Sequence, residues 1–299
     1  MADGKAIGAV LETQEWLEPT GKALQGAIKT AFDAAGQAKK PIENALNGVW
    51  LGHTLHPALV QLPVGAWTSA AVLDVLESGG KTEVGPGADA CVAMGLVGAV
   101  GAALSGMAQW YPIENPSVRK TGAAHALLNG AAVVLYGASY AARKKGDRVT
   151  GRALGWLGFG AIAVSAYLGG QMTYDHGMGV DHAPQTDLPK EFTPVLDAGT
   201  LPENTPTKAV VGTTPLVLVR RGETIHALAD ACSHFGGPLS EGRLGGDCIT
   251  CPWHGSRFRL TDGLVEDGPA TFSQPCFETR VRDGKIEVRA DAYLPQNRL

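Results

Sequence analysis

Four long apolar stretches dominate the first two thirds of the chain. They cover residues 57–77, 90–110, 122–142 and 151–172, and the second and fourth carry charge only at their ends. Each has about 20 residues, which at ~1.5 Å per residue in a helix spans a hydrocarbon core of ~30 Å. The alternative is a helical bundle buried in a soluble protein, but four successive runs of this length favour membrane spans. We therefore predict a four-helix transmembrane domain over residues 51–182.

The chain before these runs has a mixed and charged pattern. Leu24, Ile28 and Phe32 fall at helical spacing, so residues 1–50 are expected to form a helical lead-in. Such a segment lies on the membrane surface or packs on another part of the chain. Because it is charged throughout, it is not expected to be a signal peptide.

Beyond the last apolar run the pattern changes twice. Residues 183–206 are rich in Asp, Pro, Thr and Gly, which indicates a linker. From residue 208 short β-type runs alternate with turn signals, at 221–223 and 282–285 among others. We expect an all-β domain over residues 192–299. The fold class is then a multi-domain membrane protein, a bundle of four transmembrane helices followed by an all-β domain.

Composition agrees with membrane helices. Hydrophobic residues make up 44% of the chain and charged residues only 18%, with 40 glycines. Low charge and abundant glycine are typical of transmembrane helices that pack closely. The net charge of −4 gives no reason to expect nucleic acid as a partner.

The clearest chemistry lies in two short motifs of the β part. Cys232 and His234 are spaced C-x-H, and Cys251 and His254 are spaced C-x2-H. In a Rieske [2Fe–2S] centre two thiolates bind one iron and two imidazoles bind the other. Each motif would supply one ligand to each iron from its own loop. The pattern therefore predicts that these four residues bind a [2Fe–2S] cluster.

A structural zinc site is the alternative interpretation of these residues. Cys248 and Cys251 have the spacing of a zinc knuckle, and Cys232 with His254 would complete a tetrahedron. This arrangement leaves His234 without a role and lacks a second knuckle pair. The cluster is the interpretation that we favour.

The β part also resembles a known family. The segment CSHFGGPLSEG is similar to the first cluster loop of a Rieske ferredoxin-type domain, CPWHGSRF to the second, and DGPA at 267–270 to the proline loop that covers the cluster. The resemblance extends over residues 192–290 and implies an electron-transfer role. Phe235-Gly236-Gly237 and Trp253 stand where the cytochrome bc-type branch has disulfide cysteines, so the domain is more similar to ferredoxins of dioxygenase and nitrite reductase systems. Ser256 is retained, and the resemblance implies that its hydroxyl supports the cluster.

The helical part resembles a second family. The segments LGHTLHPALVQLPVGAW at 51–67 and YLGGQMTYDHGMGV at 167–180 are similar to the two ends of the DUF2231 domain. The resemblance covers residues 48–182. It implies a four-helix membrane unit that occurs alone or fused to redox modules, with no established chemistry.

Histidines gather at one face of the expected membrane domain. A four-span topology places His53 and His56, His125, and His176 and His182 at the face that carries the β domain. Imidazoles at one level of a helical bundle can ligate a b-type haem or another metal, and the leading candidates are His56, His125 and His176. The alternative is that they cap helix ends and bond backbone groups.

Together these features predict a membrane-anchored one-electron carrier. Its expected partners are membrane lipid and a redox protein, which is a reductase, an oxygenase or a respiratory complex. One alternative is a quinone- or haem-linked membrane oxidoreductase subunit, with quinone bound by the helices. Another is a non-enzymatic redox sensor or scaffold.

The expected location is the cell membrane, which the chain crosses several times. We expect the β domain on the cytoplasmic side, because clusters of this type are loaded there and no twin-arginine export signal is present. Lysines and arginines near the two membrane faces are almost equal in number, so they do not decide the orientation.

Overall fold

The computed structural model describes residues 10–183 and 188–290, and the chain divides into two compact units. The first unit contains residues 1–35 and 55–176, and the second contains 36–54 and 177–299. Residues 1–9 of the expected lead-in, 184–187 of the expected linker and 291–299 of the expected β domain lie outside the described residues.

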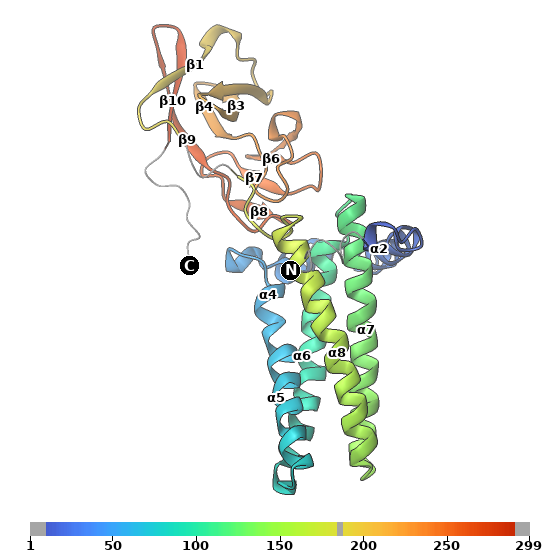
Figure 1. Cartoon of the computed structure of the whole chain (residues 1–299). Coiled ribbons are helices and arrows are strands. Elements are labelled where there is room, and N and C mark those ends of the chain that lie inside the picture. The colour runs from blue at the N-terminus through green and yellow to red at the C-terminus, as the bar shows by residue number, and fades with distance from the viewer. Residues whose placement is uncertain (1–9, 184–187, 291–299) are drawn as a thin grey trace. The chain divides into compact units, whose positions relative to one another are not determined.

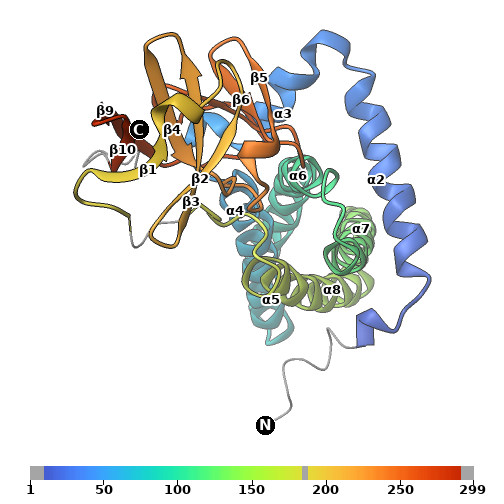
Figure 2. The same ribbon diagram turned by 90° about the horizontal axis from the view of Figure 1, so that it is seen from above.

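The first unit is a bundle of long helices that lie side by side (Figure 1). Seen from above, α5 to α8 form a ring of four (Figure 2). The bundle contains α4 (His56–Leu59), α5 (Gln61–Ser78), α6 (Gly85–Trp110), α7 (Pro116–Lys144) and α8 (Arg148–Tyr174). The expected spans all lie within these helices, which extend further at most of their ends.

Local signals explain where the last two helices begin. Asn115 precedes α7, and its Oδ1 accepts hydrogen bonds from the amides of Ser117 at 3.0 Å and Val118 at 3.3 Å, while Pro116 occupies the first helical position. Asp147 precedes α8, and its Oδ1 accepts from the Thr150 amide at 3.1 Å. These caps satisfy amides that have no partner within the helix.

Three described helices are long and apolar enough to cross a membrane: His56–Ser78, Thr82–Trp110 and Arg148–Tyr174. α7 has 29 residues but is more polar, because it carries Arg119, Lys120, His125, Asn129 and Arg143. The structure thus has three candidate membrane helices, whereas α7 as a fourth span stays a prediction.

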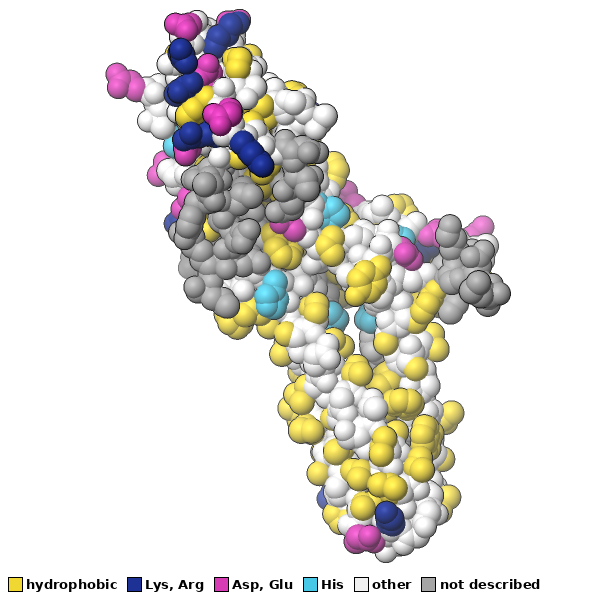
Figure 3. Space-filling view, turned by 60° about the vertical axis from the view of Figure 1, so that its left-hand side comes forward, with side chains coloured by type: hydrophobic (Ala, Val, Ile, Leu, Met, Phe, Trp, Pro, Cys, Tyr) yellow, Lys and Arg dark blue, Asp and Glu magenta, His cyan; other side chains and the backbone are white. Residues whose placement is uncertain are grey.

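The outer surface of the bundle suits a lipid environment. Val97 on α6 is 72% exposed and Val134 on α7 is 70% exposed. Hydrophobic side chains cover the middle of the helical part, and charged side chains gather at its tip (Figure 3). Without lipid around it, this surface would be an unusually large apolar patch.

The helix α2 (Leu17–Asp33) lies across one end of the bundle (Figures 1 and 2). Gln25 holds it there, because its Nε2 donates to the carbonyls of Trp110 at 3.1 Å and Ile113 at 2.9 Å. Arg119 of α7 donates through Nε to Gln25 Oε1 at 2.8 Å and forms an ion pair with Glu18 at 2.6 Å. The α2 part of the expected lead-in is therefore held against the bundle by these polar contacts, whereas residues 36–50 belong to the second unit.

The second unit contains two antiparallel sheets. The six-stranded sheet has the order β1-β10-β9-β4-β3-β2 and the four-stranded sheet the order β5-β6-β7-β8. The strands of the first are β1 (Thr193–Asp197), β2 (Thr207–Val211), β3 (Thr214–Arg221), β4 (Thr224–Ala229), β9 (Cys276–Arg282) and β10 (Lys285–Ala290). Those of the second are β5 (Arg243–Gly245), β6 (Cys248–Thr250), β7 (Arg257–Arg259) and β8 (Val265–Asp267).

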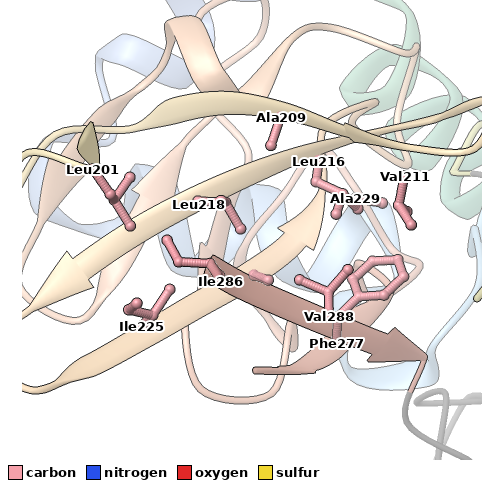
Figure 4. Close-up of a cluster of buried hydrophobic side chains, with 11 residues drawn as sticks. Leu201, Ala209, Val211, Leu216, Leu218, Ile225, Ala229, Phe277, Ile286 and Val288 are labelled. Carbon is pink, nitrogen blue, oxygen red and sulfur yellow. The ribbon is translucent and has the colours of Figure 1, made fainter. Parts of the chain in front are cut away.

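The predicted hairpins and β domain agree with these strands. Arg221 pairs with Thr224, and Arg282 pairs with Lys285, so each hairpin has a two-residue turn. The larger sheet encloses a core of aliphatic residues with Phe277 (Figure 4). β1 lies inside the stretch expected to be a linker, and it pairs with β10.

Candidate metal centre

Two loops of the smaller sheet region have the same backbone hydrogen-bond pattern. In the first, the Cys232 amide donates to the Gly237 carbonyl at 2.9 Å and the Gly236 amide to the Cys232 carbonyl at 2.7 Å. In the second, the Cys251 amide donates to the Ser256 carbonyl at 2.8 Å and the Gly255 amide to the Cys251 carbonyl at 3.2 Å. The two cysteines therefore have the same backbone setting, while the histidine follows two residues later in the first loop and three residues later in the second.

A glycine makes each of these turns possible. Gly236 and Gly255 have φ angles of 75° and 77°, a region that side chains other than glycine rarely adopt. Gly237 is needed for a different reason, because a Cβ there would lie 2.9 Å from Cys251 Sγ. The two loops approach each other this closely only because no side chain stands between them.

The two thiols lie in contact and are buried. Cys232 donates a hydrogen bond to Cys251, which lowers the pKa of Cys251 to about 7 and raises that of Cys232. The amides of His234 and Phe235 donate to the Cys232 sulfur, and those of Trp253 and His254 donate to the Cys251 sulfur. These donors stabilise negative charge on sulfur, which is the form that binds a metal.

The two imidazoles face each other beside the thiols. His234 Nδ1 lies 3.2 Å from His254 Nδ1. Two ligand atoms at ~2.1 Å from one tetrahedral metal are separated by about 3.4 Å, so the observed spacing suits a shared ion. Burial, together with the neighbouring rings of His254 and His182, lowers the pKa of His234 to about 3. The ring is therefore neutral at physiological pH, as a metal ligand must be.

The donor set suits a two-iron cluster better than one zinc ion. Two sulfurs and two nitrogens are supplied as separate pairs, and within the described residues no three His, Cys, Asp or Glu side chains surround one point. Cys248 lies on β6 opposite Arg259. Burial raises the pKa of the Cys248 thiol, which disfavours the thiolate form that a zinc ligand needs.

Buried polar side chains hold the loops in place. The Ala270 amide donates to Ser256 Oγ at 2.9 Å, which ties the second loop to the segment expected to cover the cluster. The Ser233 amide donates to Gln274 Oε1 at 3.0 Å, and Gln274 Nε2 donates to the Ala229 carbonyl at 2.8 Å. Both Ser256 and Gln274 are completely buried.

The part of the chain that contains both loops is similar to known proteins. Residues 191–278 match the family model of the Rieske [2Fe–2S] domain. The ferredoxin CarAc of Metapseudomonas resinovorans is 38% identical over 81 residues, which are 27% of this chain and 76% of that protein. The chain belongs to the Rieske [2Fe–2S] family. Its cofactor is accordingly a [2Fe–2S] cluster.

Further similarities cover both parts of the chain. The anthranilate 1,2-dioxygenase ferredoxin subunit of Burkholderia cepacia is 31% identical over 98 residues, 33% of this chain and 91% of that one. A chain in a complex of reduced oxygenase and oxidized ferredoxin in carbazole 1,9a-dioxygenase is 34% identical, with a TM-score of 0.31, over 33% of this chain and 92% of that chain. Residues 52–182 match the DUF2231 model, described as a predicted membrane protein.

The sequence did not predict that His182 and Asn44 contact residues at or near the two loops. The His182 amide donates to the Ser233 carbonyl at 3.0 Å, and its ring stacks on Phe235 at 5.1 Å. Asn44 belongs to α3 (Lys39–Asn47); its Nδ2 donates to Asp267 Oδ1 at 3.0 Å and its Oδ1 accepts from the Gly268 amide at 2.9 Å. Neither contact follows from spacing, because each joins segments that are distant in sequence.

The histidines of the expected haem site fall in different places. His56 and His125 lie within the helical bundle, whereas His176 follows α8. His53 and His182 belong to the unit that contains the Rieske domain. That all five lie at one membrane face stays a prediction.

Proposed function

We propose that Cys232 and Cys251 bind one iron of the cluster and that His234 and His254 bind the other, so that the chain works as a membrane-anchored one-electron carrier. The observation that carries this assignment is the 3.2 Å separation of the two Nδ1 atoms beside a contacting thiol pair. When bound, the cluster accepts and releases one electron at a time. The DUF2231 domain provides the membrane anchor.

The four proposed ligands differ in how far they are exposed to solvent. Cys232 and Cys251 are buried, while His234 and His254 are only half-buried, so the imidazole side is the one open to a partner. Trp253, next to His254, is 55% exposed and adds an apolar contact at this edge. The backbone amides at both sulfurs offset the negative charge that arrives with an electron.

The partner that we propose is an oxidoreductase protein, such as an oxygenase or a ferredoxin reductase. The relatives that support this are a ferredoxin, CarAc, and the ferredoxin subunit of anthranilate 1,2-dioxygenase. A respiratory complex stays a further option. A sensor or scaffold, the other alternative, would not need rapid exchange of electrons with a second protein.

A redox titration of the purified full-length chain tests this function. We expect a reversible optical change that follows a one-electron Nernst curve, and rapid reoxidation when an electron-accepting protein is added. A centre that does not cycle reversibly, or that requires two electrons, would contradict the carrier function.

For location, we propose a multi-pass membrane protein with the Rieske domain in the cytoplasm. The support is that clusters of this type are assembled in the cytoplasm. Protease added to inverted vesicles should digest the Rieske domain, whereas protease added to intact spheroplasts should not. The opposite pattern would place the domain outside.

A further inference from the structure

The helical bundle consists of two hairpins with the same pattern of buried residues. Hairpin 1 is α4 to α6, and hairpin 2 is α7 and α8. Buried residues of α5 have counterparts in α7, and each counterpart lies 69 positions later in the chain. They are Pro63, Trp67, Ala70 and Asp74 in hairpin 1, and Ala132, Tyr136, Ser139 and Arg143 in hairpin 2.

Buried residues of α6 likewise have counterparts in α8, and each of these lies 63 positions later in the chain. The buried residues are Ala88, Val92, Gly95, Ala102, Ser105 and Gln109 in α6, and Gly151, Gly155, Gly158, Ser165, Leu168 and Met172 in α8. Such a match over both helices indicates two structural repeats. Both run in the same direction, so the axis that relates them is parallel to the helices.

Equivalent residues of the two first helices meet at this axis. Trp67 stacks on Tyr136 with ring centroids 4.1 Å apart and an interplanar angle of 8°. Seven residues further on, Asp74 and Arg143 form a buried ion pair at 2.5 Å. Each aromatic ring also lies on the equivalent glycine of its own hairpin, Trp67 on Gly95 and Tyr136 on Gly158.

His56 and His125 are the next equivalent pair, and their contacts repeat in the same register. His56 Nδ1 lies 2.8 Å from the Ala102 carbonyl, and His125 Nδ1 lies 2.8 Å from the Ser165 carbonyl. Ala102 and Ser165 are equivalent positions. Four residues beyond them, Gly106 and Gly169 lie against the two rings, where a Cβ would approach the Cε1 atoms at 2.9 and 3.3 Å.

Helix geometry directs this pair toward the axis as well. At 3.6 residues per turn, the 18 residues from His56 to Asp74 make five turns and the 11 residues to Trp67 make about three, so all three share one face. The same holds for His125, Tyr136 and Arg143. The two imidazoles form a third layer, about 27 Å along the bundle from the ion pair.

The tautomer of both rings follows from their partners. A carbonyl oxygen can only accept a hydrogen bond, so each Nδ1 must carry the proton and donate it. The lone pair of each ring then lies on Nε2, as in histidines that bind a metal and are oriented by a carbonyl. The bundle thus holds two neutral imidazoles in matched positions, each prepared to act as a ligand.

We propose that His56 and His125 are the two axial ligands of a haem in the membrane domain. A bare metal ion would need further protein ligands, and no group of three His, Cys, Asp or Glu side chains occurs in the described part of the chain. Haem iron receives four nitrogens from the porphyrin and needs only two from the protein. Bundle cores commonly hold cofactors between side chains of facing helices.

The repeat also separates this pair from His176. His176 follows the last turn of α8, and the position equivalent to it in hairpin 1 is Ile113, which cannot bind a metal. The sequence-based set of His56, His125 and His176 is therefore reduced to two ligands. His176 becomes the matched control.

The test is the haem content of the full-length chain, purified in detergent from cells supplied with a haem precursor. We expect equimolar haem by the pyridine haemochromogen assay and the sharp α-band of a six-coordinate haem after reduction with dithionite. His56→Leu and His125→Leu should each lose more than about ten-fold of the bound haem, because one axial ligand is missing. His176→Leu should retain it.

A second measurement keeps the outcome decisive. Haemin is titrated into any preparation that lacks haem. Thermal unfolding in detergent shows that the bundle of each variant is folded, and the EPR signal of the Rieske cluster shows that the β domain is folded. The proposal is overturned if the wild type neither contains nor binds haem, if both ligand variants keep it, or if His176→Leu loses it equally. Loss of the cluster signal alone would instead contradict the proposed carrier function.

Discussion

The ring nitrogens of His234 and His254 carry the assignment of the metal centre, and each sits on a loop with its own cysteine. If the four residues bind the two irons in pairs, no other side chain can replace a missing imidazole. His234→Ala and His254→Ala should therefore abolish the cluster, with loss of its visible absorbance and of stoichiometric iron. His226 lies on β4, paired with Val219, and His226→Ala is the matched control that should keep the cluster. A normal spectrum in either loop variant would refute the assignment.

Ser256 supports the second loop through a buried hydrogen bond. Its Oγ accepts from the Ala270 amide at 2.9 Å, and the resemblance to Rieske domains implies that the hydroxyl also donates its proton to the cluster. Ser256→Ala leaves that amide without its partner, which costs about 1–3 kcal/mol. Thermal unfolding of the Rieske domain should occur at lower temperature, and the midpoint potential should fall, because a donor to the cluster is lost.

The control for this change is Ser240→Ala. Ser240 forms its hydrogen bond to Asp230 through the backbone amide, which the substitution preserves. Equal destabilisation by the two variants would show that the Ser256 hydroxyl has no special role.

At the scale of elements, α3 contacts the segment that covers the cluster loops. Asn44 bridges the Asp267 side chain and the Gly268 amide, and Asp267 is also paired with Arg257 at 3.0 Å. Asn44→Ala removes both hydrogen bonds at once. Hydrogen–deuterium exchange around Gly268 should become faster, with a loss of about 1–2 kcal/mol in stability.

Ile42 is the matched position on the same helix, because it is exposed and contacts the solvent. Ile42→Ala should leave the exchange around Gly268 unchanged. If Asn44→Ala also leaves it unchanged, α3 does not restrain this loop.

The buried ion pair between α5 and α7 gives a test of the bundle. Arg143 donates to both carboxylate oxygens of Asp74, and their side chains are 0% and 3% exposed. Arg143→Leu leaves a buried carboxylate without its partner and should destabilise the bundle by about 3–5 kcal/mol. The double variant with Asp74→Leu removes both charges and should recover most of that loss. Thermal unfolding in detergent measures both, and a double variant as unstable as the single one would contradict this account.

At the scale of the whole chain, sequence patterns predicted the elements better than the contacts between them. Apolar runs predicted the helices, and turn signals with β-type runs predicted the strands, because both depend on local spacing. The two cysteine–histidine motifs predicted the loops for the same reason. The fourth span stays open because α7 mixes apolar residues with residues such as Arg119 and Asn129.

Contacts between segments that are distant in sequence could not be predicted from local spacing. The Asn44 and His182 contacts, and the support from Gln274, join segments that only the fold brings together. The repeat of the two hairpins was hidden because equivalent positions differ in chemistry: Trp67 matches Tyr136, and Asp74 matches Arg143. The unequal shifts of 69 and 63 positions further conceal it. Only the contacts at the axis show that these residues correspond.

The central claim is that this membrane chain holds a cluster with two histidine nitrogens on one iron. Pulsed EPR of the dithionite-reduced full-length protein, made with nitrogen-14 and with nitrogen-15 histidine, tests it most directly. We predict a Rieske signal with an average g value below that of the free electron, and couplings to two histidine nitrogens that change with the isotope. A signal without histidine couplings, or iron bound by sulfur alone, would contradict the claim.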